Sequence, residues 1–298
     1  MVLLRICPLR KRKELGGHWS PPFSHHHLQR FPDRLEPLSP NQPVKMDKET
    51  YDPLHLASQI RPLVGRGNLR RYYRIARPGR WYGGIATADC CGCCLKCVFC
   101  WSNHPRDHPE VGKFYEPAEV FRHLDSCASK FGYKLLRVSG NEPTLCQDHL
   151  LELLRLVEES KKYRFILETN GILIDTNYAR KLSGFKCLHA RVSLKGTTEE
   201  EFSRLTGARP EAFNLQLSAL EHLVDEGVSC HPAVMLSFST REGLEELKTR
   251  LEEIDPKLPE QLEEEYVFLY PHVVERLRAA GLTPRISYRP DKVPCELI

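Results

Sequence analysis

The chain has 298 residues, of which 41% are hydrophobic and 28% charged, a composition typical of a globular protein. It has no stretch of ~20 consecutive apolar residues, and its N-terminal basic cluster follows the apolar run instead of preceding it, so we expect no membrane partner, no secretory signal and a cytoplasmic location. The net charge of +4 comes from residues 1–45, which carry +5, whereas the remainder carries −1, so charge gives no argument for nucleic acid.

Two segments precede the first clear strand. Residues 1–45 are rich in proline, histidine and arginine and show no periodicity, which predicts a disordered basic tail. Residues 46–82 are Arg-rich, with seven arginines and no acidic residue between Arg61 and Arg80. We interpret this run as a solvated helix and loop over the domain. The alternative is a surface that binds phosphates or an acidic protein, so a nucleic-acid partner stays open.

Short strands and amphipathic helices alternate over residues 83–256. The pattern predicts strands at 83–88, 134–138, 164–168, 189–194 and 231–237. It predicts helices at 116–131, 148–162, 175–182, 211–226 and 242–253. This alternation indicates βα units on a parallel sheet, hence an α/β fold with a full or partial barrel. Residues 257–298 are expected to form a small C-terminal extension, with a strand-like segment at 266–270 and a helix near 273–280.

Six of the twelve cysteines are crowded between Cys90 and Cys100. Residues this close cannot pair sensibly as disulfides, so the crowding indicates a metal site. Cys93, Cys97 and Cys100 have the spacing C-x3-C-x2-C. Three thiolates can bind three irons of a [4Fe–4S] cluster and leave the fourth iron open to a small molecule. The loop follows the first predicted strand, where βα barrels carry catalytic residues.

Spacing alone also admits other metal sites. Zinc takes four thiolates, and Cys90, Cys91 or Cys94 offers the fourth, so a structural zinc site or a four-thiolate electron-transfer cluster stays open. We interpret these three as free thiols near the cluster. The scattered cysteines are interpreted as buried small side chains; they include Cys127, Cys146, Cys187, Cys230 and Cys295.

The cysteine loop resembles that of the radical S-adenosylmethionine superfamily, which carries C-x3-C-x2-C after the first strand of a partial (β/α)6 barrel. In that family an aromatic residue usually precedes the last cysteine, and Phe99 occupies this position. The resemblance implies that S-adenosylmethionine binds the open iron through its amino and carboxylate groups. One electron from the reduced cluster then breaks its C5′–S bond, and the 5′-deoxyadenosyl radical abstracts hydrogen from a substrate.

Three later segments, each after a predicted strand, resemble motifs of the same family, in particular of members similar to pyruvate formate-lyase activating enzyme. The first resembles a G-G-E-P turn that binds the methionine amine, the second a D/E-T-N-G turn that faces the nucleoside, and the third a segment whose lysine meets the methionine carboxylate. The implied cofactor-binding residues, with Phe99, are Gly140, Asn141, Glu142, Pro143, Glu168, Thr169, Asn170, Ser193 and Lys195.

The substrate is not named by any motif. The resemblance to activating enzymes implies a protein substrate, specifically a glycyl residue, and RNA or a small metabolite is the alternative. A non-catalytic iron–sulfur or zinc protein is the third hypothesis. An external electron donor, flavodoxin-like or ferredoxin-like, is expected for either enzyme.

Overall fold

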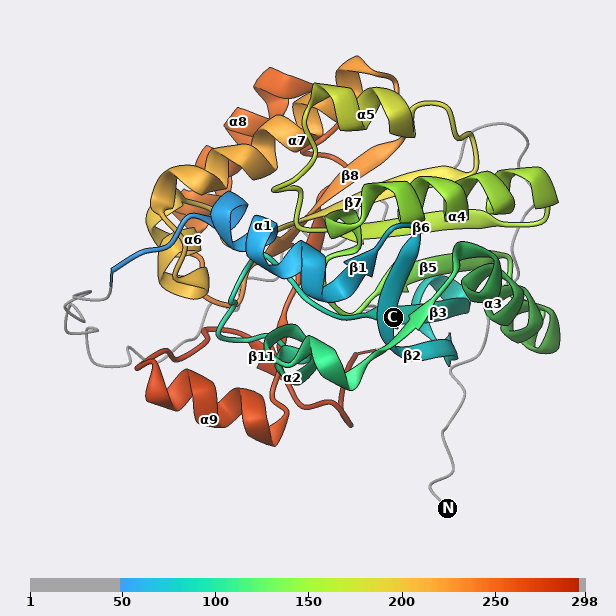
Figure 1. The fold of residues 1–298 in the computed structure, drawn as a ribbon. Helices are drawn as coiled ribbons and strands as arrows, with labels where there is room; N and C mark the ends of the chain where they lie inside the picture. Colours follow the sequence, from blue (N-terminus) through green and yellow to red (C-terminus); the bar gives the residue numbers. More distant parts are fainter. Residues whose placement is uncertain (1–48, 295–298) are drawn as a thin grey trace.

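The computed structural model describes residues 49–294, and its central feature is a curved, mostly parallel sheet (Figure 1). Six neighbouring strands run parallel: β3 Ile85–Cys90, β5 Leu135–Ser139, β6 Arg164–Thr169, β7 Leu188–Leu194, β8 Cys230–Met235 and β9 Glu263–Glu265. Within the described residues the sheet stays open, with β1 and β9 at its edges. The predicted α/β partial barrel is therefore confirmed. The predicted tail, residues 1–45, lies outside the described residues.

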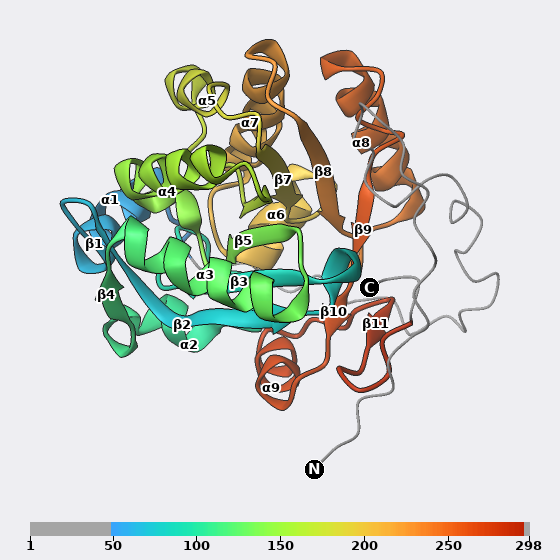
Figure 2. The ribbon, with the colours of Figure 1, turned by 90° about the vertical axis from the view of Figure 1, so that its right-hand side faces the viewer.

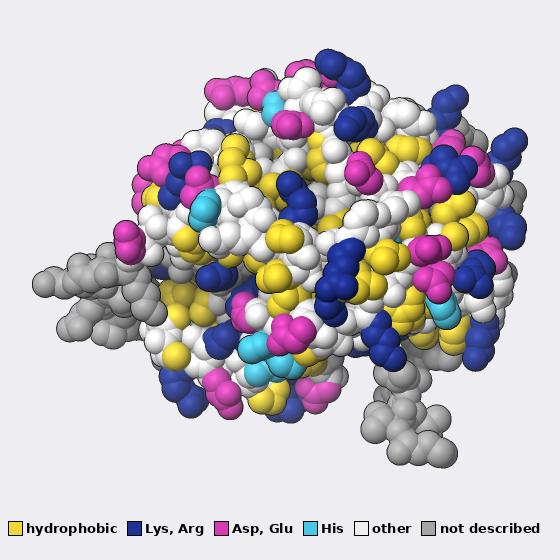
Figure 3. All heavy atoms as spheres, in the orientation of Figure 1, with side chains coloured by type: hydrophobic (Ala, Val, Ile, Leu, Met, Phe, Trp, Pro, Cys, Tyr) yellow, Lys and Arg dark blue, Asp and Glu magenta, His cyan; other side chains and the backbone are white. Residues whose placement is uncertain are grey.

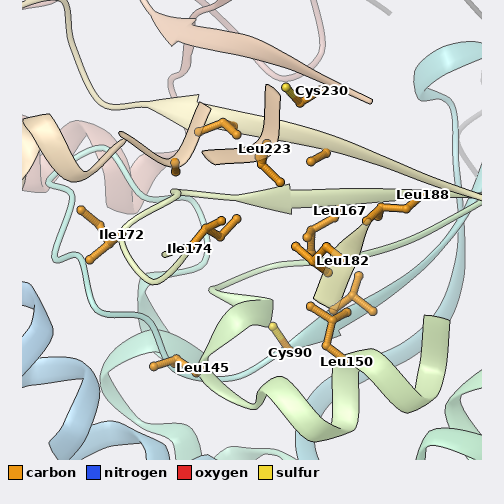
Figure 4. Packing of buried hydrophobic residues seen from close by; sticks show 14 of the residues in the cluster. Cys90, Leu145, Leu150, Leu167, Ile172, Ile174, Leu182, Leu188, Leu223 and Cys230 are labelled. Atoms are coloured by element: carbon orange, nitrogen blue, oxygen red, sulfur yellow. The ribbon is translucent and has the colours of Figure 1, made fainter. Parts of the chain in front are cut away.

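Helices cover the outer face of this sheet (Figure 2). They are α3 Pro117–Phe131, α4 Gln147–Ser160, α5 Thr176–Leu182, α7 Phe213–Asp225 and α8 Arg241–Ile254, whereas α6 Glu199–Thr206 follows the end of β7 and packs on α7. In α4, Leu150, Leu153, Leu154 and Val157 follow helical spacing and are all buried. Figure 4 shows Leu150, Leu182 and Leu223 from three helices gathered around Leu167 and Leu188 of the sheet. This helix–sheet layer is the apolar core.

The inner face of the sheet is different. On β5 the residues that alternate with the outer core are Arg137 and Ser139, and on β7 they are Arg191 and Ser193, all buried. At the start of the strands, Ile85, Leu135 and Ile166 pack with Tyr82 and close the inside of the barrel with an apolar plug. Successive side chains of a strand point to opposite faces, so the same short strands contribute apolar side chains to the outer face and polar side chains to the inner face.

The Arg-rich segment is a strand, so the predicted helix and loop are wrong for most of it. Helix α1 spans Pro53–Val64, and the chain then enters β1 Gly65–Arg66 and β2 Leu69–Gly79. β2 pairs antiparallel with β3 and with β4 Lys113–Tyr115. Arg70 is 1% exposed, and its guanidinium donates to the carbonyls of Cys91 and Glu142 at 2.8 and 2.9 Å. An arginine can be buried when its N–H groups have hydrogen-bond acceptors. The residue type alone does not predict this burial.

The C-terminal segment completes the sheet and adds a small unit beside it. The sixth parallel strand, β9, consists of three glutamates and lies beyond residue 256. Only part of the predicted strand at 266–270 forms, as β10 Val267–Phe268 paired with β11 Ser287–Tyr288. Helix α9, Pro271–Ala279, follows the predicted position closely. No helix among residues 49–294 is both long enough and apolar enough to cross a bilayer.

Candidate functional site

The cysteine loop leaves the end of β3 through a constrained turn. Gly92 has φ +79°, and a Cβ there would lie 2.8 Å from side-chain atoms of Ile60 and Val64 in α1. Its amide donates to the carbonyl of Pro105, and its own carbonyl accepts from the amide of Glu142 at 3.0 Å. Glycine is therefore required here both by backbone conformation and by close packing. The turn fixes where the following cysteines begin.

Cys93, Cys97 and Cys100 lie on this loop, as the spacing predicts. Cys97 is buried, and Cys93 and Cys100 are half-buried. A hydrogen bond from the Cys94 thiol lowers the pKa of Cys93, although burial opposes this effect. Burial raises the pKa of Cys97 to about 12, against the nearby charge of Lys195, which lowers it. Bound iron would offset that burial cost, because metals bind the thiolate form.

The neighbouring thiols have other environments. Cys90 points into the outer apolar layer near Leu150, and burial raises its pKa to about 11 (Figure 4). Burial likewise raises the pKa of Cys91 to about 12, and the backbone amide of Gly112 hydrogen-bonds this thiol. Cys94 is buried and contacts Asn170. Within residues 49–294 no three His, Cys, Asp or Glu side chains gather closely enough for one metal ion, and this holds for Cys93, Cys97 and Cys100 as well, so the arrangement does not distinguish the cluster from the zinc alternative.

The turn at Gly140–Pro143 lies against the same loop. Gly140 has φ +92°, and its carbonyl accepts from the Ser102 hydroxyl and from the Asn141 side-chain amide. The amide nitrogen of Asn141 also reaches Ser102, whereas its Oδ1 is buried without a hydrogen-bond partner. An unsatisfied buried acceptor is costly and marks a place for a donor. This oxygen fits the ammonium group that the resemblance assigns to this turn.

Glu142 links two of the predicted motifs. It is 2% exposed, its Oε1 accepts from the hydroxyls of Thr144 and Thr169 at 2.6 and 2.7 Å, and its Oε2 accepts from the Asn170 amide at 2.8 Å. The carboxylate is thus fully engaged by the protein, and buried Pro143 continues the turn. Glu142 therefore holds the turns after β5 and β6 together and has no free oxygen for a ligand.

The residues after β6 divide between the loop and the interior. The Asn170 side-chain amide lies 3.6 Å from Cys93 Sγ and 3.4 Å from Cys94 Sγ. Glu168 faces the inside of the barrel, where it accepts from Ser139 at 2.6 Å and pairs with Arg137 at 2.5 Å. Burial acts to raise the pKa of Glu168, but the charges of Arg137 and Arg191 lower it below its usual value. Glu168 is accordingly an interior carboxylate held in its charged form.

At the end of β7, Lys195 and Ser193 enter the same interior. Ser193 accepts from Arg191 at 2.9 Å, and Lys195 Nζ lies 3.7 Å from Glu265 Oε2. That Glu265 oxygen is buried and has no hydrogen-bond partner, so a donor or cation fits there. The predicted lysine thus has a carboxylate neighbour that the sequence did not reveal. Lys195 also lies close enough to Cys97 for its charge to lower the pKa of that thiol.

A second ion cluster continues deeper into the barrel. Arg191 forms a fork with Glu263 at 2.6 and 3.0 Å and also reaches Glu265 at 3.0 Å. His231 lies 3.0 Å from Glu263 and 2.7 Å from His189. The pKa of Glu263 lies well below its usual range: burial raises it, but Arg191 and the His231 hydrogen bond lower it more. His231 is therefore held by hydrogen bonds within this network.

Gln216 is a site residue that the sequence analysis missed. It is fully buried in α7, and its side-chain amide donates to the carbonyls of Asn170 and Ser193 while its oxygen accepts from the Lys195 amide. It joins the ends of β6 and β7. In the sequence, its one distinguishing feature is that a glutamine side chain occupies the otherwise apolar face of a predicted helix. Phe99, by contrast, packs in the loop with its ring 6.1 Å from that of Phe238.

A groove of about 790 Å³ lies elsewhere, between α1, the start of α4 and residues 172–178. None of the predicted site residues lines it. The site described above is instead defined by the loop and by the inward-facing side chains.

Comparison with known proteins agrees with these motifs. A model of the Radical SAM superfamily matches residues 89–251, more than half of the chain. Fe-coproporphyrin III synthase of Methanosarcina barkeri is 34% identical over 138 residues, covering 46% of this chain and 32% of that protein. A probable GTP 3′,8-cyclase of Methanocaldococcus jannaschii is 30% identical over 114 residues, covering 38% of this chain and 37% of that protein.

Among solved structures, Streptococcus suis SuiB bound to precursor peptide SuiA aligns with a TM-score of 0.46 and 25% identity, over 55% of this chain and 35% of that chain. The match thus spans about a third of the length of these relatives. The family model, which matches more than half of the chain, places this chain in the radical SAM superfamily, whose members bind a [4Fe–4S] cluster and S-adenosylmethionine.

Proposed function

We propose that this chain is a radical SAM enzyme acting on a small polar substrate held in the charged interior of the barrel. One observation carries the proposal: ionisable side chains line the inner face up to the cysteine loop. They are Arg137, Glu168, Arg191, Lys195, Glu263 and Glu265. Buried ion pairs are costly, because apolar side chains in their place would stabilise the fold as well or better. A charged interior therefore suits a ligand with polar or charged groups.

The chain's own residues have distinct proposed roles around the cofactors. Cys93, Cys97 and Cys100 hold the cluster, which when bound supplies the electron that cleaves S-adenosylmethionine to the hydrogen-abstracting 5′-deoxyadenosyl radical. Asn141 Oδ1 accepts a hydrogen bond from the methionine amine, and Lys195 pairs with the methionine carboxylate.

The other predicted residues shape the site. Gly140 and Pro143 set the turn that carries Asn141, and Phe99 packs behind the cluster loop. Glu142 positions Thr169 and Asn170 at the nucleoside side. Glu168 and Ser193 lie with the interior ion pairs.

Hydrogen abstraction from a protein glycyl residue, the activating-enzyme hypothesis, has weaker support. The turn at Glu168–Gly171 that suggested it is engaged by Glu142 and the cysteines, an arrangement that serves any substrate. The curated relatives described above carry the names of a cyclase and a synthase. A glycyl peptide therefore serves as a comparison substrate.

An RNA substrate is also weakly supported. Arg70 and Arg71 bind backbone carbonyls, and Arg74 and Arg77 pair with Asp89, so these groups have partners within the chain. In the view of Figure 3, acidic and basic side chains are interspersed over the face. Neither feature resembles a continuous phosphate-binding surface.

The test is anaerobic. The chain is reconstituted with iron and sulfide, reduced by dithionite or by a flavodoxin or ferredoxin, and mixed with S-adenosylmethionine; 5′-deoxyadenosine is then quantified. We expect slow basal formation, accelerated by a polar metabolite, with GTP the first probe because a matched relative is a probable GTP cyclase. Absence of 5′-deoxyadenosine, with a cluster spectrum unchanged by S-adenosylmethionine, would contradict the enzyme assignment. Acceleration by a glycyl peptide or RNA, but by no small metabolite, would contradict the proposed substrate class.

A further inference from the structure

The main chain of the cysteine loop depends on side chains from outside it. The carbonyl of Cys97 accepts from Arg106 at 2.8 Å. Further along, the carbonyl of Val98 accepts from Arg276 Nε at 2.9 Å, and that of Cys100 accepts from the same guanidinium through Nη2. The two carbonyls lie on either side of Phe99; one follows the second predicted cluster ligand, and the other belongs to the third. A single side chain thus connects two points of the loop.

The guanidinium belongs to α9, a helix in the C-terminal segment for which the sequence analysis proposed no role. On the same face of α9, His272 lies one turn earlier, and its Nε2 is 3.0 Å from the carbonyl of Trp101. A neighbouring face carries Val273 and Leu277, which are buried in an apolar cluster with Leu205 and Met235. Val98 and Phe99 pack against the same cluster. The helix is therefore anchored by its own apolar contacts while its polar face meets the loop.

The chemistry of this contact suits a flexible metal-binding loop. A guanidinium presents several donors in a rigid planar fork, so it can fix the separation and orientation of two carbonyls at once. The two bonds are charge-assisted, and Arg276 is partly shielded from water. Its positive charge also lies near Cys100 and Arg106, on the thiolate side of the site. A lysine at this position would keep the charge but lose the fork.

We propose that Arg276 is a positioning residue of the cluster site, holding the main chain on both sides of Phe99 so that Cys97 and Cys100 keep the geometry needed for iron. His272 supports the next peptide. The proposal concerns this chain's hold on the family's cofactor and is independent of the substrate proposed above. Helix α9 is accordingly a working part of the cofactor site, even though it lies outside the strand-and-helix units of the barrel (Figure 2).

The test compares Arg276→Gln with Arg276→Lys and with Arg278→Gln, an exposed arginine on the same helix. Each variant is reconstituted anaerobically, and iron and sulfide content, the rate of iron transfer to a chelator and the paramagnetic spectrum of the reduced cluster are measured. We expect Arg276→Gln to lose iron roughly tenfold faster than the wild type, the equivalent of about one charge-assisted hydrogen bond. Its spectrum should broaden or shift. Arg278→Gln should match the wild type.

Two further measurements separate positioning from general stability. The thermal midpoint of each apo-protein reports on the fold, and we expect Arg276→Gln to keep it, because Val273 and Leu277 still anchor α9. Arg276→Lys should fold normally and lose iron at an intermediate rate. Wild-type iron retention and spectrum in Arg276→Gln would overturn the proposal. Full retention of iron in Arg276→Lys would also overturn it, because only the charge would then matter. So would iron loss in Arg276→Gln that is explained by a lowered thermal midpoint of the apo-protein.

Discussion

The outer face of strand β7 carries only apolar side chains, while its inner face carries His189, Arg191 and Ser193. Both faces are buried. The outer face is stabilised by helix packing alone, whereas the inner face keeps charges that need specific partners. Stability explains the first arrangement directly. The charged inner face costs stability, and this cost has a function only if the charges bind a ligand. The outer face therefore stabilises the fold, and the inner face provides the polar groups of the site.

Substitution of the cysteines should have the largest effect on cluster binding, and cysteines occur both in the loop at the site and in the outer apolar layer. Cys97→Ala should abolish cluster binding and 5′-deoxyadenosine formation, because one iron loses its thiolate. Cys90→Ala, in the outer apolar layer, should leave both intact. The measurements are iron content, visible absorption and product formation after anaerobic reconstitution. Loss of the cluster in Cys90→Ala would show that the ligand assignment is wrong.

Next in size is the interior ion cluster. Arg191→Leu should lower the free energy of unfolding by about 3–5 kcal/mol, because Glu263 and Glu265, both largely shielded from water, lose the guanidinium that they share. Combining it with Glu263→Leu should recover much of the loss. Urea unfolding of the apo-proteins measures both. If the single and double variants were equally unstable, the cost would come from packing and not from an unpaired charge.

The outer layer should respond as an ordinary core. Leu154→Ala, at a fully buried position of α4, should cost about 2–5 kcal/mol in the free energy of unfolding. Cluster content and 5′-deoxyadenosine formation per folded molecule should not change. Urea unfolding and product assays below the transition provide the comparison. If Leu154→Ala lost activity without losing stability, the outer face would also contribute to the site, which would contradict the separate roles of the two faces.

The smallest expected effect concerns pH and His149, which packs on the outer side between Tyr72 and Asn68. Burial lowers its pKa to about 4, assisted by Arg70 and opposed by the hydrogen bond to Asn68. The unfolded chain therefore binds the proton more tightly, so acidification from about pH 6.5 towards pH 4 favours unfolding. His149→Gln should reduce the stability lost between pH 7 and pH 5.5 by about 1 kcal/mol. An unchanged pH slope would contradict the assignment.

Periodicity and spacing predicted the five strands and five helices named between residues 83 and 254, because those elements depend on local apolar patterns. They did not predict helix α2 Asn103–Asp107, strand β4 or helix α6, which are short. The same pattern contained an unused signal: Arg137, Glu168 and Arg191 interrupt otherwise apolar strands, which is typical of a polar interior. β2 and β9 were harder, since arginines and glutamates suggest solvent exposure. Their burial depends on partners far along the chain, such as the carbonyls that Arg70 reaches and the Arg191 that Glu263 meets.

The cysteine ligands follow from spacing and the motif order, but the supports of the site do not. Gln216 meets Asn170 and Ser193, and Arg276 meets Val98, only after the sheet and α9 have assembled. No local pattern marks either side chain. Asn141 is intermediate: the sequence shows asparagine where the G-G-E-P turn has its second glycine, but the unsatisfied oxygen that this residue introduces is evident only in three dimensions.

The bond between Arg276 and Cys100 joins positions 176 residues apart in the sequence. During synthesis the cysteines therefore leave the ribosome long before the side chain that secures their loop has been made. Iron inserted before α9 has been synthesised would enter a loop that lacks the hydrogen bonds from Arg276, so metal delivery should be most productive once α9 has packed against the loop. Folding and cluster loading would then occur in a fixed order, with the packing of α9 preceding stable cluster binding.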